Sequence, residues 1–345
     1  MEKKKVVIIG GGNIAGTAHI PYYQARQELE VVAIVGRNAE RAQTFSEKHD
    51  IPRFYIDADE MYAAEKPDIV SVCTPNSLHY ADVMKALENG CHVLCEKPPA
   101  ISARDALDMH QTAVKNNLIL AYNFLHRFAE DVKIVREKAL SGLLGEIYVT
   151  KVQALRRSGI PGWGSFTNKE LQGGGPLIDI GIHMLDSAMY VLDFPTVKKV
   201  TAKQFQKIGT QKSNGSFGEW DPEKYEVEDS LFGFIEFEGG NLLQIETSFA
   251  LNIKEDSIMN ATFYGDQAGA TLFPAHIYTD ENGKLKTLYQ KGQADPDCQQ
   301  KSMQAFVDKC SGKDTMIADG EQGYIIQRIV EALYESAEKG ESISL

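Results

Sequence analysis

The first 122 residues alternate short apolar runs with amphipathic stretches. The apolar runs predict strands at residues 5–9, 31–35, 69–72, 93–95 and 118–121, and helical periodicity appears at 39–48, 80–88 and 103–115. Strands joined by crossover helices are parallel and buried on both faces, which makes them continuously apolar. The pattern therefore predicts a doubly wound parallel sheet, a Rossmann-type α/β domain, over residues 1–122.

The pattern changes after residue 122. A strand is expected near residues 146–153 and a helix from about Pro176 to Leu192, and residues 197–288 form successive strands separated by turn motifs such as Asn282-Gly283. Two helices close the chain. We therefore predict a second domain over residues 123–345, of α+β class with a large open, mainly antiparallel sheet. The last helix is also a candidate to pack back on the first domain.

Composition excludes several classes of function. The 345-residue chain carries a formal net charge of −12, which opposes binding to nucleic acid. The apolar run after the N-terminal lysines ends at Gly10, and no run approaches membrane-spanning length, so we expect a cytoplasmic protein without a signal peptide or a membrane partner. Five cysteines form neither a disulfide framework nor a zinc pattern, and we predict no metal site.

The first strand runs into a glycine motif, Gly10-x-Gly12-x-x-Ala15, at the start of an amphipathic stretch. In a dinucleotide site the first glycine permits the tight turn and the second lets the pyrophosphate approach the backbone, while the small third residue lets helix and strand pack closely. Asn13 and Ile14 begin the helix, whose unpaired N–H groups attract an anion. We expect these residues to bind a dinucleotide.

The end of the second strand bears on the choice of cofactor. Gly36-Arg37 stands where NAD-selective proteins commonly place an acidic residue for the ribose hydroxyls. Because that carboxylate is missing and Arg37 is able to pair with a 2′-phosphate, we favour NADP over NAD. The alternative is that Arg37 is a solvated residue and the protein uses NAD through other contacts.

Two further strand ends carry polar motifs. Thr74-Pro75-Asn76, followed by His79, comes after the strand at 69–72, and Glu96-Lys97-Pro98 comes after the strand at 93–95. Ligands bind at the carboxyl ends of strands in open α/β sheets, so both turns are candidate cofactor-binding segments. A Glu-Lys-Pro turn taken alone is more often a surface loop with a solvated lysine.

Asp179 and His183 are four residues apart on the helix predicted from Pro176. At this spacing they share a face, so the carboxylate can orient the imidazole and stabilise its charged form, as proton transfer requires. Apolar neighbours would exclude water from the pair. A purely structural hydrogen bond between the two side chains is the competing interpretation.

The chain resembles the Gfo/Idh/MocA oxidoreductases, named for glucose-fructose oxidoreductase, inositol dehydrogenase and a rhizopine-catabolism protein. The likeness covers nearly the whole chain and rests on the glycine motif with Ala18-His19, Thr74-Pro75-Asn76 with His79, Glu96-Lys97-Pro98, Asn123 with Arg127-Phe128, residues 173–183, and Tyr334-Glu335-Ser336-Ala337. The order and spacing of these elements together are highly specific, whereas none is decisive alone.

The resemblance implies roles for three residues. In the family, the lysine of the Glu-Lys-Pro motif lies by the nicotinamide and the substrate, and the later Asp and His form a proton-transfer dyad, which implies catalytic roles for Lys97, Asp179 and His183. The same family often forms dimers or tetramers through its open sheet. We therefore expect a homodimer or a homotetramer.

Substrate contacts are expected from Lys97, Asp179 and His183 and from three further residues. Asn123 is one of the residues on which the resemblance rests, and a subgroup of the family has a segment like the one from Arg156 to Gly164. Trp163 would pack against sugar C–H groups while Arg156 meets hydroxyls. A structured surface loop is the competing interpretation of this segment.

These observations predict an NAD(P)-dependent oxidoreductase that transfers hydride between nicotinamide and a secondary alcohol or ketone of a sugar, an inositol-like cyclitol or a related polyol. Two alternatives stay open. One is an NAD-dependent glycosidase of the same superfamily, which oxidises its substrate transiently, and the other is a non-catalytic regulator that binds a dinucleotide.

Overall fold

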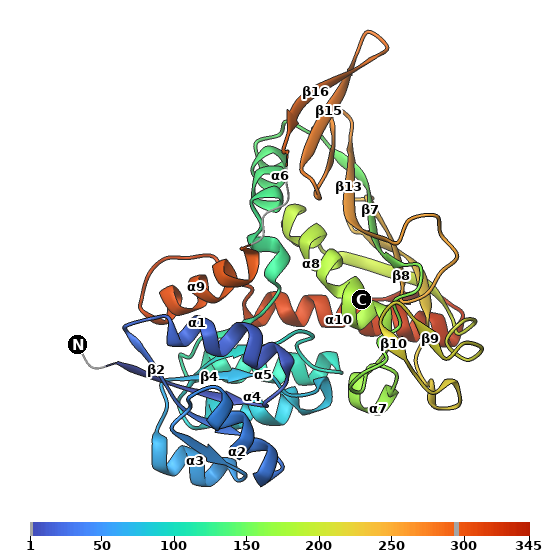
Figure 1. Ribbon diagram of the computed structural model, residues 1–345. Helices are drawn as coiled ribbons and strands as arrows, with labels where there is room; N and C mark the ends of the chain where they lie inside the picture. Colours follow the sequence, from blue (N-terminus) through green and yellow to red (C-terminus); the bar gives the residue numbers. More distant parts are fainter. Residues whose placement is uncertain (1–2, 293–296) are drawn as a thin grey trace. The chain divides into compact units, whose positions relative to one another are not determined.

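The computed structural model describes residues 3–292 and 297–345, which divide into two compact units. The first unit groups residues up to Asn123 with residues 299–327, and the second groups residues 124–298 with residues 328–345. The sequence-based boundary at residue 122 assigns residues 299–327 to the second domain, whereas their contacts join them to the first unit. Figure 1 labels many of the helices and strands of both units.

A six-stranded parallel sheet forms the centre of the first unit, in the order β3-β2-β1-β4-β5-β6. Its strands are β1 (Lys4–Ile9), β2 (Leu29–Val35), β3 (Arg53–Tyr55), β4 (Ile69–Val72), β5 (His92–Cys95) and β6 (Leu120–Tyr122). The four central strands are almost entirely buried. The doubly wound sheet predicted from the apolar runs is confirmed.

Helices flank this sheet, and their boundaries follow the sequence closely. They are η1 (Ala15–His19), α1 (Ile20–Gln24), α2 (Ala39–Lys48), α3 (Ala58–Glu65), η2 (Asn76–Leu78), α4 (His79–Glu88), α5 (Ala103–Lys115) and α9 (Cys298–Cys310). The expected helices 39–48 and 103–115 match α2 and α5. Strand β3 and helix α3 were not predicted, because β3 is a three-residue edge strand without buried residues.

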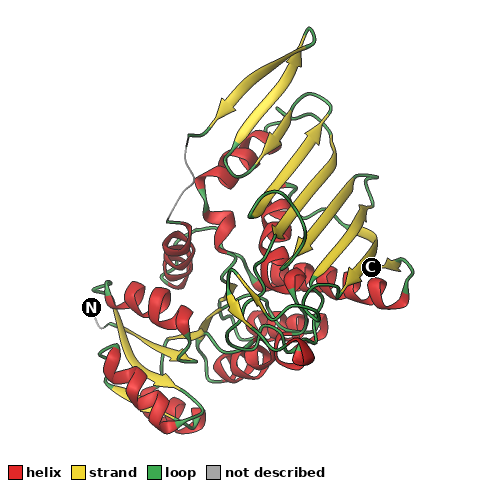
Figure 2. Cartoon of the chain, turned by 45° about the vertical axis from the view of Figure 1, so that its right-hand side comes forward, coloured by secondary structure: helices red, strands yellow, loops and turns green. Residues whose placement is uncertain are grey.

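A nine-stranded sheet forms the second unit, in the order β16-β15-β14-β13-β7-β12-β11-β8-β17, and Figure 2 shows most of its strands side by side. The strands are β7 (Ile147–Arg156), β8 (Val197–Phe205), β11 (Ser230–Phe237), β12 (Leu242–Ser248), β13 (Ser257–Gly265), β14 (Gly269–Thr271), β15 (His276–Glu281), β16 (Lys284–Gln290) and β17 (Ile343–Ser344). Only the β7–β12 pair is parallel. The mainly antiparallel sheet is confirmed.

The remaining elements of the second unit are helices and one small hairpin. They are η3 (Leu125–Phe128), α6 (Glu130–Leu140), α7 (Lys169–Gln172), η4 (Leu177–Gly181), α8 (Ile182–Val191), β9 (Asn214–Gly215), β10 (Gly218–Glu219) and η5 (Pro222–Lys224). Helix α10 (Gly320–Lys339) begins in the first unit and ends in the second. Within the described part of the chain, no helix is long and apolar enough to span a membrane.

Candidate active site

The glycine turn between β1 and the first helix fits a dinucleotide. Gly10 has a φ of +97°, and a Cβ there would lie 2.7 Å from the Cys73 carbonyl oxygen, so the turn requires glycine. A Cβ on Gly12 would meet only that same oxygen, at 3.9 Å, which leaves its exposed side open. Helical structure starts at Asn13 and Ile14, while Ala15 is fully buried against the sheet. The open backbone at a helix N-terminus is where a pyrophosphate binds.

Gly36 and Arg37 follow the carboxyl end of β2, which pairs with β1, the strand before the glycine turn. A Cβ on Gly36 would lie 3.1 Å from the Cβ of Ala42, so a larger side chain would press on α2. Arg37 is exposed, and its charge acts on Asp82, lowering a carboxyl pKa that burial raises overall. The Asn38 side chain caps α2 by accepting from the Arg41 N–H at 2.9 Å. The guanidinium is thus available at the strand end for an anionic group.

Two turns at neighbouring strand ends are joined by a buried histidine. His79 is fully buried, with Nδ1 2.7 Å from the Pro98 carbonyl oxygen and Nε2 2.9 Å from that of Thr74. Its side chain therefore links the Thr74-Pro75-Asn76 turn to the Glu96-Lys97-Pro98 turn. The Thr74 hydroxyl donates to Asp82 at 2.7 Å, while Pro75, Asn76 and Lys97 are half-exposed. Backbone and half-exposed groups at these turns remain the candidates for cofactor contact.

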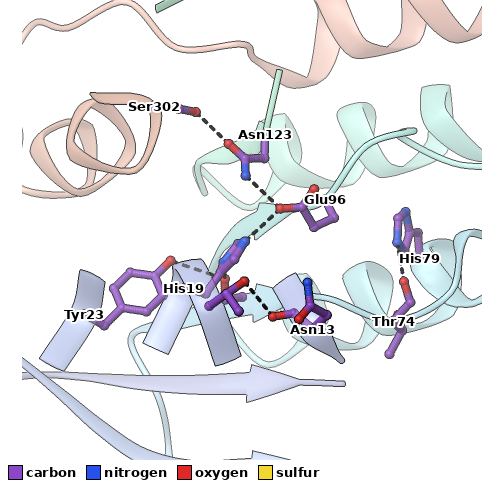
Figure 3. A network of polar contacts seen from close by, with 10 residues as sticks. Asn13, His19, Tyr23, Thr74, His79, Glu96, Asn123 and Ser302 are labelled. Atoms are coloured by element: carbon purple, nitrogen blue, oxygen red, sulfur yellow. Dashed lines mark hydrogen bonds and ion pairs between the residues drawn. The ribbon is translucent and has the colours of Figure 1, made fainter. Parts of the chain in front are cut away.

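Glu96 of the Glu-Lys-Pro turn belongs to a chain of hydrogen-bonded polar side chains (Figure 3). His19 Nε2 lies 2.8 Å from Glu96 Oε1, which also accepts from Asn123 Nδ2 at 2.7 Å. Ser302 of α9 donates to Asn123 Oδ1 at 2.9 Å. On the other side, His19 Nδ1 lies 2.6 Å from Ser71 Oγ. Because both ends of the Asn123 amide are used within this unit, its side chain acts on Glu96.

Burial and pairing set the charges in this polar chain. Burial lowers the pKa of His19, but Cys73 and the bonded Glu96 outweigh it and raise the pKa to about 10. Burial likewise raises the pKa of Glu96, but His19, Asn123 and the charge of Lys97 outweigh it and lower that pKa. The pair is therefore an imidazolium and a carboxylate at neutral pH. A fixed negative charge thus precedes Lys97 in the chain.

Asp179 and His183 lie on a helix that is otherwise hidden. All residues from Gly174 to Val191 are buried except these two, which are half-exposed. The helix widens into a π turn at Leu177–Gly181, where the Ile182 N–H donates to the Leu177 carbonyl. Such turns are rare and recur at functional sites. The predicted helix from Pro176 to Leu192 is confirmed, and the π turn is an addition to it.

A carboxylate from the loop before β11 holds the start of this helix. Glu228 accepts from the Gly175 N–H at 2.8 Å, the Leu177 N–H at 3.2 Å and the Tyr334 hydroxyl at 2.8 Å. Burial raises the pKa of Glu228, against the three hydrogen bonds, which lower it. A Cβ on Gly174 would lie 2.2 Å from the Tyr334 hydroxyl oxygen. The turn before the dyad is therefore fixed by Glu228 and Tyr334.

Further contacts hold η4 and α8, the helical segments that carry Asp179 and His183. Asp186, fully buried on α8, forms an ion pair with fully buried Arg127, whose Nε donates to Asp186 Oδ2 at 3.0 Å. A Cβ on Gly181 would lie 2.4 Å from the Thr247 methyl carbon, so glycine lets the helix approach β12. The His126 ring lies 5.0 Å from the His183 ring at an interplanar angle of 86°. No cluster of three or more metal-ligating side chains occurs in the described residues.

Arg156 and Trp163 belong to the same unit as the dyad. Burial lowers the pKa of Arg156, while the nearby Asp179 carboxylate raises it. The guanidinium lies 4.8 Å from the Phe217 ring centroid, and Phe217 lies 5.7 Å from Trp163. The Trp163 side chain is 57% exposed. Arg156 is thus linked to Asp179 by its charge and to Trp163 through the Phe217 ring.

No sequence pattern indicates a role for His126, for Glu228 or for the ion pair of His19 with Glu96. His19 and Tyr334 were noted only as part of the family pattern, without a role. Glu96 stays a predicted cofactor-binding residue, and its Oε1 also bonds His19 and Asn123. The partners are 77 positions apart for His19 and Glu96 and 106 apart for Glu228 and Tyr334, so no local pattern could pair them.

Comparisons with known proteins identify the family of the chain. The family model "Oxidoreductase family, NAD-binding Rossmann fold" matches residues 4–124, and "Oxidoreductase family, C-terminal alpha/beta domain" matches residues 136–345. D-glucoside 3-dehydrogenase of Escherichia coli (strain K12) is 59% identical over 99% of this chain and 97% of its own. Glucose-6-phosphate 3-dehydrogenase of Bacillus subtilis (strain 168) is 32% identical over 61% of this chain and 60% of its own.

A solved structure of levoglucosan dehydrogenase in complex with NADH and levoglucosan has a TM-score of 0.84, with 18% identity and 99% coverage of both chains. That likeness concerns the fold. The two family matches span almost the whole chain and confirm the predicted resemblance. The chain therefore belongs to the Gfo/Idh/MocA oxidoreductase family and is an NAD(P)-dependent dehydrogenase.

Proposed function

We propose that this dehydrogenase oxidises the 3-hydroxyl group of a D-glucoside to a ketone. The observation that carries the proposal is the pair Asp179 and His183, which are half-exposed on a helix whose other residues from Gly174 to Val191 are buried. The 59% identity with a D-glucoside 3-dehydrogenase supports the substrate class.

The dyad performs the proton transfer in this proposal. His183 takes the proton of the reacting hydroxyl, and Asp179 stabilises the imidazolium that results. The Lys97 ammonium stabilises the developing alkoxide. Bound nicotinamide supplies the hydride acceptor. In the reverse direction His183 returns the proton to the carbonyl oxygen.

We assign the cofactor-binding residues from the open strand ends of the first unit. The backbone of Gly10, Gly12, Asn13 and Ile14 binds the pyrophosphate. The turns from Thr74 to Asn76 and from Glu96 to Lys97 line the nicotinamide half, with His79 acting through its two backbone bonds. We favour NADP because exposed Arg37 is placed for a 2′-phosphate. A lower Michaelis constant for NAD than for NADP would reverse this preference.

Arg156 and Trp163 are the proposed substrate contacts beyond Lys97 and the dyad. Arg156 offers donors to sugar hydroxyls beside Asp179, and Trp163 offers an aromatic face. Asn123 acts on the site through Glu96, since its amide donates to Glu96 and accepts from Ser302 within the first unit. The direct substrate contact expected for Asn123 from the sequence stays a prediction beside this role, because its amide keeps a second N–H and a second lone pair.

Isotope labelling tests the reaction. A glucoside deuterated at C3 should transfer its deuterium to the cofactor and show a primary isotope effect, whereas the C2- or C4-deuterated compounds should show neither. The readout is absorbance at the reduced-nicotinamide band together with the mass of the cofactor. Release of the aglycone from an aryl glucoside without added cofactor would instead support the glycosidase alternative.

Substitutions test the residue roles. Lys97→Met and His183→Ala should each lower kcat by about 100-fold or more while cofactor binding is kept. His276→Ala is the matched control, because His276 is also half-exposed in the second unit but lies on β15 and bonds Thr287 at 3.1 Å. Near-normal turnover in both Lys97→Met and His183→Ala would refute the assignment.

We also propose a homodimer or homotetramer in the cytoplasm. On β11, Leu231 and Ile235 are fully buried under the helices, whereas Phe234 on the opposite face is 47% exposed. Phe205 and Tyr264 are also exposed on strands of this sheet. Covering such aromatic residues with a second copy of the chain would remove apolar surface from water. Light scattering of the protein and of Phe234→Glu measures the oligomeric state.

A further inference from the structure

Both tryptophans of the chain line one hollow in the second unit. The chain contains only Trp163 and Trp220. The hollow has a volume of about 480 Å³ and is lined by residues 161–164, Thr167, residues 219–221 and Lys224. Its aromatic and polar groups are interleaved, which distinguishes it from a plain apolar groove.

Trp163 is supported in an exposed position. Its ring lies 5.7 Å from Phe217 and 6.4 Å from Phe166, at interplanar angles of 46° and 78°. The indole nevertheless remains 57% exposed. Leaving an apolar ring of this size in water is unfavourable, whereas holding it still lowers the entropy lost when a ligand covers it.

The hollow's walls are locked together by the backbone. The Gly162 N–H donates to the Phe217 carbonyl at 2.8 Å, and a Cβ on Gly162 would lie 2.4 Å from the Glu219 carbonyl oxygen. Trp220 Nε1 donates to the Gly209 carbonyl at 2.9 Å, which fixes the second indole. The segment after β7 and the β9–β10 hairpin therefore present a preformed surface.

The polar groups indicate a neutral ligand rich in hydroxyls. Glu219 and Asp221 are exposed carboxylates, and Lys224 pairs with Asp221 at 3.1 Å. These three residues sum to one negative charge, which disfavours a phosphate. Carboxylates accept from sugar hydroxyls, and an aromatic face packs on sugar C–H groups.

The hollow is connected to the dyad without being part of it. Arg156 interacts electrostatically with Asp179 on one side and lies 4.8 Å from the Phe217 ring on the other, and Phe217 in turn contacts Trp163. Arg156 thus interacts both with Asp179 and with the Phe217 ring that contacts Trp163. A group attached to the reacting sugar, rather than the reacting sugar itself, is the one that would cover Trp163.

We propose that this hollow is an aglycone subsite that binds a second, neutral pyranose ring of the glucoside. The proposal rests on the proposed function, since it assumes that the first ring reacts at the dyad. It makes the enzyme favour disaccharides over simple alkyl glucosides and over phosphorylated ones.

Kinetics with two substrates test the subsite. Wild-type kcat/KM should be higher for a glucosyl disaccharide than for the methyl glucoside of the same anomer. Trp163→Ala should lower kcat/KM for the disaccharide about tenfold and for the methyl glucoside less than threefold. The control is Tyr148→Ala, because Tyr148 is 52% exposed but lies at the other end of β7 and outside the hollow. Equal losses on both substrates would overturn the subsite.

Fluorescence gives a second measurement on the unaltered protein. Because the only two tryptophans line the hollow, titration with the disaccharide, without added cofactor, should change the tryptophan emission saturably, and the methyl glucoside should change it less. Unchanged emission at disaccharide concentrations well above KM would overturn the subsite. Failure to oxidise either glucoside would refute the proposed function instead, and the binding titration would still decide whether the hollow binds a sugar.

Discussion

Glu96 in the first unit precedes Lys97, and Glu228 in the second bonds the backbone just before Asp179, but the partners of the two carboxylates differ. Glu96 pairs with a buried imidazole, and its pKa is lowered. Glu228 accepts only from neutral donors, two backbone N–H groups and a phenol, and its pKa is raised by burial. The same functional group is thus used for two tasks.

The difference indicates what each carboxylate contributes. Paired with His19, Glu96 keeps its charge beside Lys97, so it bears on the electrostatics of the proposed alkoxide-stabilising group. Bonded to the Gly175 and Leu177 N–H groups, Glu228 bears on where the backbone before Asp179 lies. One carboxylate sets a charge and the other sets a position.

The largest expected effect comes from breaking the charged pair. Glu96→Ala would leave a buried imidazolium without its carboxylate, so the free energy of unfolding should fall by about 3–5 kcal/mol. Urea unfolding measures it, with Glu88→Ala as the control because Glu88 is exposed on α4. A loss no larger than that of the control would mean that His19 and Glu96 are not an ion pair.

Glu228→Gln should have the next largest effect. The new amide group would place a donor against an existing donor, which should cost about 2 kcal/mol of unfolding free energy. Because the dyad turn shifts, kcat should fall about tenfold while the dissociation constant of the cofactor stays unchanged. Glu226→Gln is the control, since Glu226 is exposed and accepts from the Lys169 N–H at 3.0 Å. Unchanged kcat in Glu228→Gln would remove its positioning role.

The charge of His19, the partner of Glu96, should make the free energy of unfolding depend on pH. The pKa of His19 is raised from 6.5 to about 10, so its contribution is full below pH 6.5 and is lost as the pH rises toward 10. Between pH 7 and 8.5, wild-type unfolding free energy should fall by at most about 1.4 kcal/mol per pH unit, and His19→Gln should show a flatter dependence. Parallel curves for the two proteins would contradict a charged His19.

Glu228 should act in a different range. A carboxyl whose pKa is raised on folding stabilises most below its unfolded value of 4.5, and the contribution is lost as the pH rises through the folded value. Glu96, whose pKa is lowered, contributes above 4.5 and loses its effect as the pH falls. In acid, each variant's plot of unfolding free energy against pH should differ in slope from that of the wild type. The difference should have one sign for Glu228→Gln and the opposite sign for Glu96→Gln.

The smallest expected effect is that of Tyr334→Phe. It removes one of the three donors to Glu228 and should cost about 1 kcal/mol of unfolding free energy, with a smaller fall in kcat than Glu228→Gln. Tyr148→Phe provides the control, because the Tyr148 side chain is 52% exposed. A kcat loss equal to that of Glu228→Gln would show that the phenol, rather than the carboxylate, fixes the turn.

Local patterns predicted the parts of this molecule that local physics determines. The apolar runs located the central parallel strands, and the glycine motif located a turn where Gly10 has a positive φ. The spacing of Asp179 and His183 identified the two half-exposed positions of a buried helix. The roles proposed for these side chains stay predictions.

Contacts between distant segments could not be predicted in this way. Nothing near Glu228 in the sequence marks it as the acceptor for the turn at Gly175, 53 positions earlier. The grouping of residues 299–327 with the first unit depends on pairings such as the Tyr122 N–H with the Ala318 carbonyl. The π turn also has no pattern of its own, because its wider backbone carries the same apolar residues as an α-helix.

The position of β7 in its sheet has a consequence for folding. Its two neighbours, β12 and β13, come from much later in the chain, and Gln153 bonds Glu246 across 93 positions. Non-local strand pairing of this kind is slow, because a long loop must close before contacts compensate for it. During synthesis α8 emerges before either neighbour, so β7 gains both of its neighbouring strands only after residue 265 has been made.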